Sequence, residues 1–237
     1  LNHIGIIYDE INSYTKALEI YSKSLEIKRT TGNPKEIAYA LHIIGNTYLK
    51  LEKYDEALEY FNEALKIRIQ INDKINIAAT LKSIGNASIG IKDYKRAFGS
   101  FNDAIKMREE IGDIKGVSDV LNDIGNFYFQ TDNYIKSKEY FLRVLEITEK
   151  TGDKYTEALC RRKIGVIQIS ENNLIVGLEN INKSLEIGEK IGNLELIKNA
   201  YFELYSYYNK INNKSNALKN YIHYTLVKDS ITQRFNA

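Results

Sequence analysis

Residues 43–48 read IIGNTY, an apolar run that is interrupted by a glycine and an asparagine. The same trio recurs as Ile84-Gly85-Asn86 and Ile124-Gly125-Asn126, each time 40 residues further along the chain. A glycine inside a helix costs about 1 kcal/mol relative to alanine, so its repetition needs a reason. The trio therefore raises two questions: what the glycine packs against, and what the asparagine binds.

Glycines and large apolar residues mark a 40-residue period along the whole chain. The glycines are Gly5, Gly45, Gly85, Gly125 and Gly165, and the sixth repeat carries Tyr205 at this position. Further on in each repeat stands a large apolar or aromatic residue, at Tyr21, Phe61, Phe101, Phe141, Ile181 and Tyr221. We expect repeats at about residues 1–31, 32–71, 72–111, 112–151, 152–191 and 192–237.

Within a repeat, the apolar spacing is that of two amphipathic helices, with the stripes Leu41-Ile44-Tyr48 and Ala57-Phe61-Leu65. Between repeats, Gly or Asn is followed by Asp or Asn, which are signals that end one helix and cap the next. Asn33, with Pro34 and Glu36 after it, is the fullest example. The sequence therefore predicts an all-α solenoid of about six antiparallel helix pairs.

The pattern Leu41-x-x-Ile44-Gly45-x-x-Tyr48, followed by Ala57-x-x-x-Phe61, resembles the tetratricopeptide repeat. The resemblance covers essentially the whole chain, although the usual repeat has about 34 residues. The longer variety is similar to the repeats of spindle-orientation adaptors and of bacterial peptide-sensing regulators. The resemblance implies a right-handed superhelix whose first helices line a concave groove for an extended or helical peptide, and it implies no catalysis.

The asparagine follows the packing glycine by about 100° around the helix, which turns it away from the buried stripe. The resemblance implies that this side faces the groove. We therefore expect an amide ladder of Asn46, Asn86 and Asn126 that binds a peptide backbone. One turn earlier on the same face stand His42, Lys82, Asn122 and Arg162, and one turn later stand Leu49, Ile89 and Phe129.

Two alternatives to the peptide ladder stay open. The set is similar to the carboxylate clamp of chaperone-binding tetratricopeptide domains, but Val166 and Asn122 interrupt that pattern. The asparagines are also frequent at this position in the family, so they could be consensus surface residues without a ligand.

The fifth repeat departs from the pattern, since Arg161 stands at an apolar position while Gln168 and Gly177 replace Tyr and Ala. We favour relaxed packing near an array end over an anion-binding notch made by Arg161 and Arg162. In the sixth repeat, a dense aromatic group either caps the core or seats a second copy of the chain, and it comprises Tyr201, Phe202, Tyr205, Tyr207 and Tyr208.

Composition favours a binding protein over an enzyme. The 33 basic and 31 acidic residues are interspersed, which does not predict nucleic-acid binding. No apolar run approaches the ~18 residues of a membrane span, so we expect no membrane insertion. The single cysteine, Cys160, stands at a small-residue position and is expected to be a buried packing thiol. The three histidines are far apart and no catalytic or metal-binding motif occurs, so we expect no catalysis, cofactor or metal. Without a signal peptide, we expect a cytoplasmic protein.

The sequence thus predicts a non-catalytic scaffold that binds a peptide or protein in its concave groove. Leu1 begins in mid-pattern, so we expect a segment of a longer chain. The residues 221–231, YIHYTLVKDSI, resemble the close of repeat arrays in bacterial histidine kinases and response regulators. One alternative is therefore a sensory or regulatory segment of a bacterial signalling protein, such as a histidine kinase, cyclase or transcriptional regulator. Another is an oligomerisation or spacer element that forms a homodimer through an array end.

Overall fold

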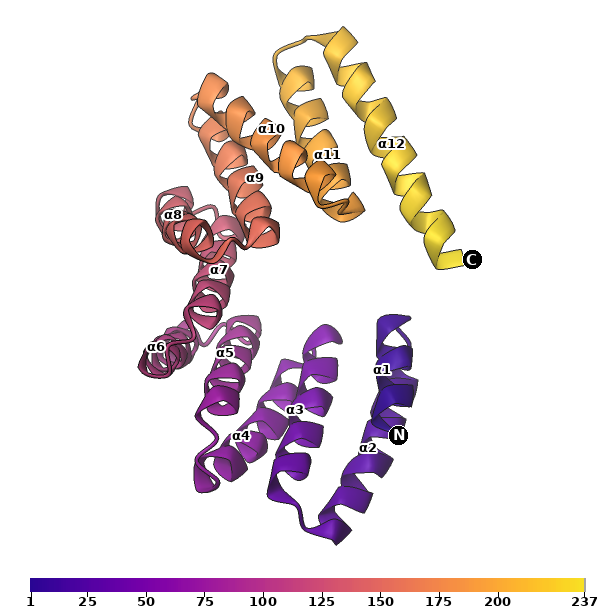
Figure 1. The fold of residues 1–237 in the computed structure, drawn as a ribbon, viewed down its shortest axis with the longest axis vertical. Helices are drawn as coiled ribbons and strands as arrows, with labels where there is room; N and C mark the ends of the chain where they lie inside the picture. The colour runs from indigo at the N-terminus through magenta and orange to yellow at the C-terminus, as the bar shows by residue number, and fades with distance from the viewer. Residues whose placement is uncertain (237) are drawn as a thin grey trace. The chain divides into compact units, whose positions relative to one another are not determined.

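The computed structural model describes residues 1–236, with side chains through residue 233. These residues form twelve α-helices and no strand, which confirms the all-α prediction (Figure 1). The helices are α1 (Asn2–Glu10), α2 (Tyr14–Thr31), α3 (Pro34–Lys50), α4 (Tyr54–Gln70), α5 (Lys74–Gly90), α6 (Tyr94–Glu110), α7 (Ile114–Gln130), α8 (Tyr134–Thr151), α9 (Lys154–Ser170), α10 (Leu174–Lys190), α11 (Leu194–Lys210) and α12 (Lys214–Asn236).

Each repeat supplies one odd-numbered helix, here called the first helix, and one even-numbered helix, here called the second helix. The turns between repeats contain a residue with positive φ, namely Gly32, Asn72, Gly112, Gly152 and Gly192. Gly and Asn adopt this left-handed conformation most readily, as the stop signals in the sequence predict. Asn33 then caps α3, because its side chain accepts hydrogen bonds from the backbone N–H groups of Lys35 and Glu36.

The chain divides into two compact units, an N-terminal unit (Leu1–Val120) and a C-terminal unit (Leu121–Ala237). Within the N-terminal unit, α2 contacts α1 and α3, while α4 contacts α3 and α5. Within the C-terminal unit, α10 contacts α9 and α11 in the same way. These second helices therefore pack against the first helix of their own repeat and against that of the next repeat. A single continuous solenoid over all six repeats stays a prediction.

The repeated glycine lets the first helix lie directly against a buried ring of the second helix. A Cβ atom on Gly45 would lie 2.6 Å from Cε1 of Phe61, and one on Gly125 would lie 2.8 Å from Cε1 of Phe141. Both rings are fully buried, so they have no room to move aside. The glycine is therefore required by packing, which answers the first question that IIGNTY raises.

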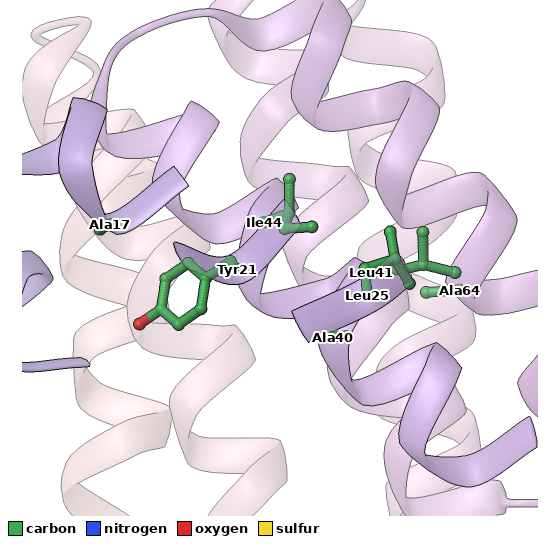
Figure 2. Close-up of a cluster of buried hydrophobic side chains, with 7 residues drawn as sticks. All are labelled: Ala17, Tyr21, Leu25, Ala40, Leu41, Ile44 and Ala64. Atoms are coloured by element: carbon green, nitrogen blue, oxygen red, sulfur yellow. The ribbon is translucent and has the colours of Figure 1, made fainter. Parts of the chain in front are cut away.

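The core of the N-terminal unit begins with a cluster from α2, α3 and α4 that comprises Ala17, Tyr21, Leu25, Ala40, Leu41, Ile44 and Ala64 (Figure 2). The cluster joins the stripe of α3 to both second helices that flank it. Figure 2 shows the hydroxyl of Tyr21 pointing away from Ile44 and Leu41. The ring of Tyr21 is thus part of the core, while its polar end points elsewhere.

In the second and fourth repeats, stacked tyrosines also connect the first helix with the second helix. The rings of Tyr48 and Tyr60 are stacked with centroids 5.4 Å apart. The rings of Tyr128 and Tyr140, at the same repeat positions, are stacked with centroids 5.7 Å apart. The fifth repeat carries Gln168 and Asn180 at these two positions, and there Asn180 Nδ2 donates to Gln168 Oε1 over 2.9 Å.

The other unusual residues of the fifth repeat also contact each other in pairs. Arg161 stands where the first four repeats have Leu, and its Nε donates over 2.8 Å to Glu157, which stands where the second, third, fourth and sixth repeats have Ile or Val. A Cβ on Gly165 would lie 2.7 Å from the carbonyl oxygen of Gly177, so α9 and α10 approach closely. The expectation of relaxed packing is therefore wrong for this repeat, because each departure has a partner that compensates for it.

The aromatic residues of the sixth repeat pack against α12. The rings of Tyr201 and His223 are stacked 4.9 Å apart, and those of Phe202 and Tyr224 are 5.4 Å apart. These contacts match the capping interpretation. On α12, Leu218, Ile222 and Leu226 are exposed. A second copy at this end stays a prediction, which the mass from sedimentation velocity would test.

The glycine contact predicts opposite effects for two alanine substitutions in the N-terminal unit. Gly45→Ala is expected to lower the free energy of unfolding by about 1–2 kcal/mol, because the clash with Phe61 outweighs the gain in helix propensity. Gly99→Ala is the matched control, since a Cβ on this mid-helix glycine of α6 would meet nothing within 4 Å. It is expected to raise stability by about 0.5–1 kcal/mol. Urea unfolding followed by circular dichroism measures both, and a stabilised Gly45→Ala variant would contradict the packing account.

Candidate protein-binding surface

The side of the first helices that carries the ten residues predicted from the sequence is called the first-helix face below. All ten are half-buried. In the N-terminal unit it holds His42, Asn46 and Leu49 on α3, and Lys82, Asn86 and Ile89 on α5. In the C-terminal unit it holds Asn122, Asn126 and Phe129 on α7, and Arg162 on α9.

Polar residues of this face connect neighbouring first helices of the N-terminal unit. Ser83 of α5 donates its hydroxyl to Oδ1 of Asn46 over 3.5 Å. The amide nitrogen of Asn46 makes no hydrogen bond within the part of the chain that the structure describes. Lys82 and Asn86 also have interaction partners. Asn46 of α3 therefore contacts α5 through its oxygen, and its amide nitrogen is still available as a donor.

His42 lies at the junction of α3, α4 and α5. Its ring centroid is 5.3 Å from that of Phe61, and its Nδ1 is 3.2 Å from Nη1 of Arg68. The same Arg68 nitrogen donates to the backbone carbonyl of Asn76 and to the hydroxyl of Thr80. Burial first, and then the charges of Arg68 and Lys82, lower the pKa of His42 to about 3. His42 is thus a neutral acceptor for a buried guanidinium.

The C-terminal unit has the same kind of bridges with different chemistry. Nη1 of Arg162 on α9 forms an ion pair with Glu203 of α11 over 2.7 Å. Nζ of Lys163 lies 3.9 Å from the ring centroid of Phe129, a cation–π contact between α9 and α7. Arg161 and Arg162 each have a carboxylate partner from the chain itself, so the anion-binding notch is already occupied.

Asn122 and Asn126 differ in their surroundings. Oδ1 of Asn122 accepts from Sγ of Cys160 over 3.7 Å. Cys160 is fully buried, and burial together with the charge of Asp153 raises the pKa of its thiol to about 12. The prediction of a packing thiol is confirmed. The Asn126 amide makes no hydrogen bond among the described residues, so both its donor and its acceptor are available to a ligand.

Two hollows lie at equivalent repeat positions on the first-helix face, one in each unit. The hollow of the N-terminal unit has a volume of about 340 Å³ and lies between α1, α2 and α3. It is lined by residues that include Ile6, Asp9, Tyr21, Ile43, Asn46 and Lys50. The hollow of the C-terminal unit has about 120 Å³, and Val166, Ile169, Ile181, Glu203, Ser206 and Lys210 stand at the corresponding positions.

A third hollow, of about 450 Å³, lies away from the predicted residues, between α4, α5 and α6. Leu65, Ile77 and Leu81 line its apolar part, and Asp103 and Lys106 also line it. Among the residues that the structure describes, no group of three or more His, Cys, Asp and Glu side chains could hold a metal ion. Within residues 1–236, no helix has both the length and the apolar character that crossing a membrane requires.

Models of the tetratricopeptide repeat match residues 36–110 and, separately, residues 1–31 and 118–151. The chain belongs to the tetratricopeptide repeat family. The particular likeness to spindle-orientation adaptors stays a prediction. A search of curated proteins finds no match for the sequence.

Several solved structures share the fold. The apo form of RapI is 16% identical over 98% of this chain and 97% of its own, with a TM-score of 0.68. A Rap protein complexed with competence and sporulation factor is 18% identical, with a TM-score of 0.67, over 98% of this chain and 64% of its own. A signal-transduction ATPase with numerous domains from Pyrococcus horikoshii has a tetratricopeptide repeat sensor. It is 16% identical over 95% of this chain and 38% of its own, with a TM-score of 0.71.

Sequence reasoning missed the residues that complete these bridges. Ser83, Lys163 and Glu203 occupy the same repeat position, which is Ile43 in the second repeat. Ser83 and Lys163 directly follow predicted site residues, and Glu203 directly follows the equivalent position of the sixth repeat. The signal was present as a polar residue in place of Ile, but its partner on the neighbouring first helix could not be assigned without coordinates.

His42 predicts a pH dependence of stability with a definite sign. In the unfolded chain a histidine has a pKa of about 6.5, so unfolding takes up a proton below that pH while native His42 stays neutral. Stability is therefore lost as the pH falls from about 6.5 towards 3, by about 2 kcal/mol at about pH 5. Urea unfolding at about pH 7.5 and about pH 5 measures this loss as a difference in the free energy of unfolding. In His42→Gln, that difference is expected to be smaller by the contribution of His42. His3→Gln, at an exposed position, is the control. Equal pH dependence in wild type and His42→Gln would contradict the assignment.

Proposed function

We propose that the chain is a non-catalytic scaffold that binds a protein segment along its first-helix face. The observation that carries the proposal is the repetition of one arrangement in both units. Each unit has half-buried polar side chains that bridge first helices, an apolar residue one turn beyond an asparagine, and a hollow at the same repeat position. Concave sites with apolar walls and a few converging polar groups are typical of ligand binding.

The available groups fit the backbone of an extended peptide. Such a backbone presents one N–H and one C=O group per residue, and it needs partners for both when it is bound. The amide of Asn126 offers both kinds of group, and Asn46 offers its nitrogen. Leu49, Ile89 and Phe129 are half-buried and supply apolar area for side chains of the ligand. Recognition of this kind depends on the backbone more than on the sequence of the ligand.

The solved structures support the general role. One of them, the Rap protein, is complexed with competence and sporulation factor, and this chain covers 64% of that protein. The tetratricopeptide repeat family consists generally of interaction scaffolds.

A sensory segment of a larger signalling protein is the second candidate. The Pyrococcus horikoshii protein uses a tetratricopeptide repeat array as a sensor, and this chain covers 38% of it. In this candidate the array transmits a signal to an attached module rather than only docking a partner. The full-length coding sequence distinguishes them by the presence or absence of a kinase, cyclase or DNA-binding module.

The proposal predicts that the asparagines contribute to peptide affinity separately in each unit. Linear peptides selected from a random phage-display library on the wild-type chain would be titrated by fluorescence anisotropy. Two variants are compared with the wild type: one carries Asn46→Ala and Asn86→Ala together, and the other carries Asn126→Ala. Each is expected to lower the affinity for peptides held by its own unit roughly tenfold, since each amide hydrogen bond contributes about 1 kcal/mol. The unit whose variant weakens binding is the unit that holds the peptide.

Matched controls separate binding from folding. The controls remove exposed asparagines of the second helices and are expected to leave the affinity unchanged. They are a variant with both Asn62→Ala and Asn102→Ala, and a variant with Asn182→Ala. Thermal melts would confirm that all variants are folded. If peptides bind equally to every variant, the first-helix face is not the site, and the hollow between α4, α5 and α6 becomes the next candidate.

A further inference from the structure

The hollow of the N-terminal unit contains a carboxylate oxygen without a partner. Asp9 forms an ion pair with Lys50 of α3 through Oδ2. Its other oxygen, Oδ1, is buried and has no hydrogen-bond partner among the described residues. A buried acceptor that lacks a donor is unfavourable by about 1–3 kcal/mol, so such atoms are rare unless a ligand or water supplies the donor.

Other polar groups of the same hollow converge with Asp9. Tyr21 lines it, and the corresponding residues of the next four repeats are Phe or Ile, which have no hydroxyl. Burial first, and then the charge of Asp9, raise the pKa of Tyr21 to about 12. Asn46 lines the hollow from α3, and its amide nitrogen makes no hydrogen bond among the described residues, while Ile6 and Ile43 supply apolar walls.

The equivalent hollow of the C-terminal unit shows which features are special. There Ile169 takes the place of Asp9, and Nζ of Lys210 donates instead to the backbone carbonyl of Ile169 over 3.3 Å. Ile181 takes the place of Tyr21. This hollow has about 120 Å³ against about 340 Å³ in the N-terminal unit. The acid, the hydroxyl and the larger volume therefore occur together in the N-terminal hollow.

We propose that the N-terminal hollow binds one apolar side chain of an extended peptide together with a neutral backbone N–H group that donates to Oδ1 of Asp9. Lys50 already balances the charge of Asp9, so a cationic donor would add an unbalanced charge to a half-buried site. A neutral amide satisfies the free oxygen without that cost. The apolar walls and the volume accommodate the side chain beside the amide. This inference rests on the proposed function and names the chemistry that one part of the face selects.

The test uses a small probe, N-acetyl-leucine N-methylamide, and its fully N-methylated analogue, which has no N–H group. Methyl NMR of the isotope-labelled chain follows Ile6 and Ile43 during titration of each probe. The N–H probe is expected to cause saturable shifts of both methyl groups and to bind roughly tenfold more tightly than the analogue. In Asp9→Ile, which introduces the residue of the equivalent hollow, the ratio of the two affinities is expected to fall to about one.

The control is Glu10→Ile, which makes the same replacement at the exposed neighbouring position of α1 and is expected to keep the tenfold ratio. A ratio near one in the wild-type chain, or a ratio that survives Asp9→Ile, would overturn the inference. Saturable shifts that avoid Ile6 and Ile43 would overturn it as well. If selected library peptides bind through the asparagines while Asp9→Ile leaves them unaffected, the proposed function stands and this inference fails. If no library peptide binds the chain, the proposed function fails whatever the small probe does.

Discussion

The contact between a glycine of the first helix and a buried ring of the second helix determines how closely the two helices of a repeat approach. It fills the same repeat position in each of the first four repeats, with Tyr21, Phe61, Phe101 and Phe141 as the rings. Each glycine costs about 1 kcal/mol of helix propensity, whereas complete burial of a large apolar side chain contributes about 1.5–3 kcal/mol. The close approach of the two helices of a repeat is therefore favourable overall.

The last repeat differs from the others at this contact. Tyr205 replaces the glycine there, and the ring position, Tyr221, is 45% exposed, whereas the equivalent rings of the first four repeats are at most 2% exposed. The two tyrosine rings lie beside each other instead, with centroids 5.2 Å apart. The fifth repeat solves the problem in a third way, since Gly165 and Gly177 let the two backbones meet directly. The spacing of a helix pair thus depends both on the lack of a side chain at the glycine position and on the residue at the ring position that packs there.

The first-helix face has two roles as a consequence. Its polar residues contact the next first helix: Asn46 accepts a hydrogen bond from Ser83, and Arg162 forms an ion pair with Glu203. The same residues stay half-buried, and some keep donors or acceptors that the chain itself does not use. Stability of a repeat array is approximately a sum of terms within repeats and between neighbours. Substitutions on this face are therefore expected to affect both binding and the coupling between repeats, which is why the binding variants need matched folding controls.

The 40-residue period was sufficient to predict the helices, their caps and the packing role of the glycine, because these features depend on local spacing and on residue type. It was not sufficient for the pairs of side chains that meet between helices, whether within one repeat or across repeats. His42 with Arg68, Asp9 with Lys50, and Arg162 with Glu203 are separated by 26 to 41 residues, and the period does not specify which charges meet. Glu157 did carry a signal, because it departs from the Ile or Val of its repeat position together with Arg161, the residue that it contacts. Paired departures from a repeat pattern are therefore more informative than single ones.

A double-mutant cycle between Gly85 and Phe101 tests the central claim most directly, because the three heavy atoms nearest to a Cβ on Gly85 would all belong to the ring of Phe101. Gly85→Ala, Phe101→Leu and the double variant would be compared by urea unfolding. The account predicts that the smaller leucine relieves the clash, so the double variant is more stable than the sum of the single effects by about 1 kcal/mol or more. Additive effects would show that the glycine does not act through the ring, and they would contradict the account.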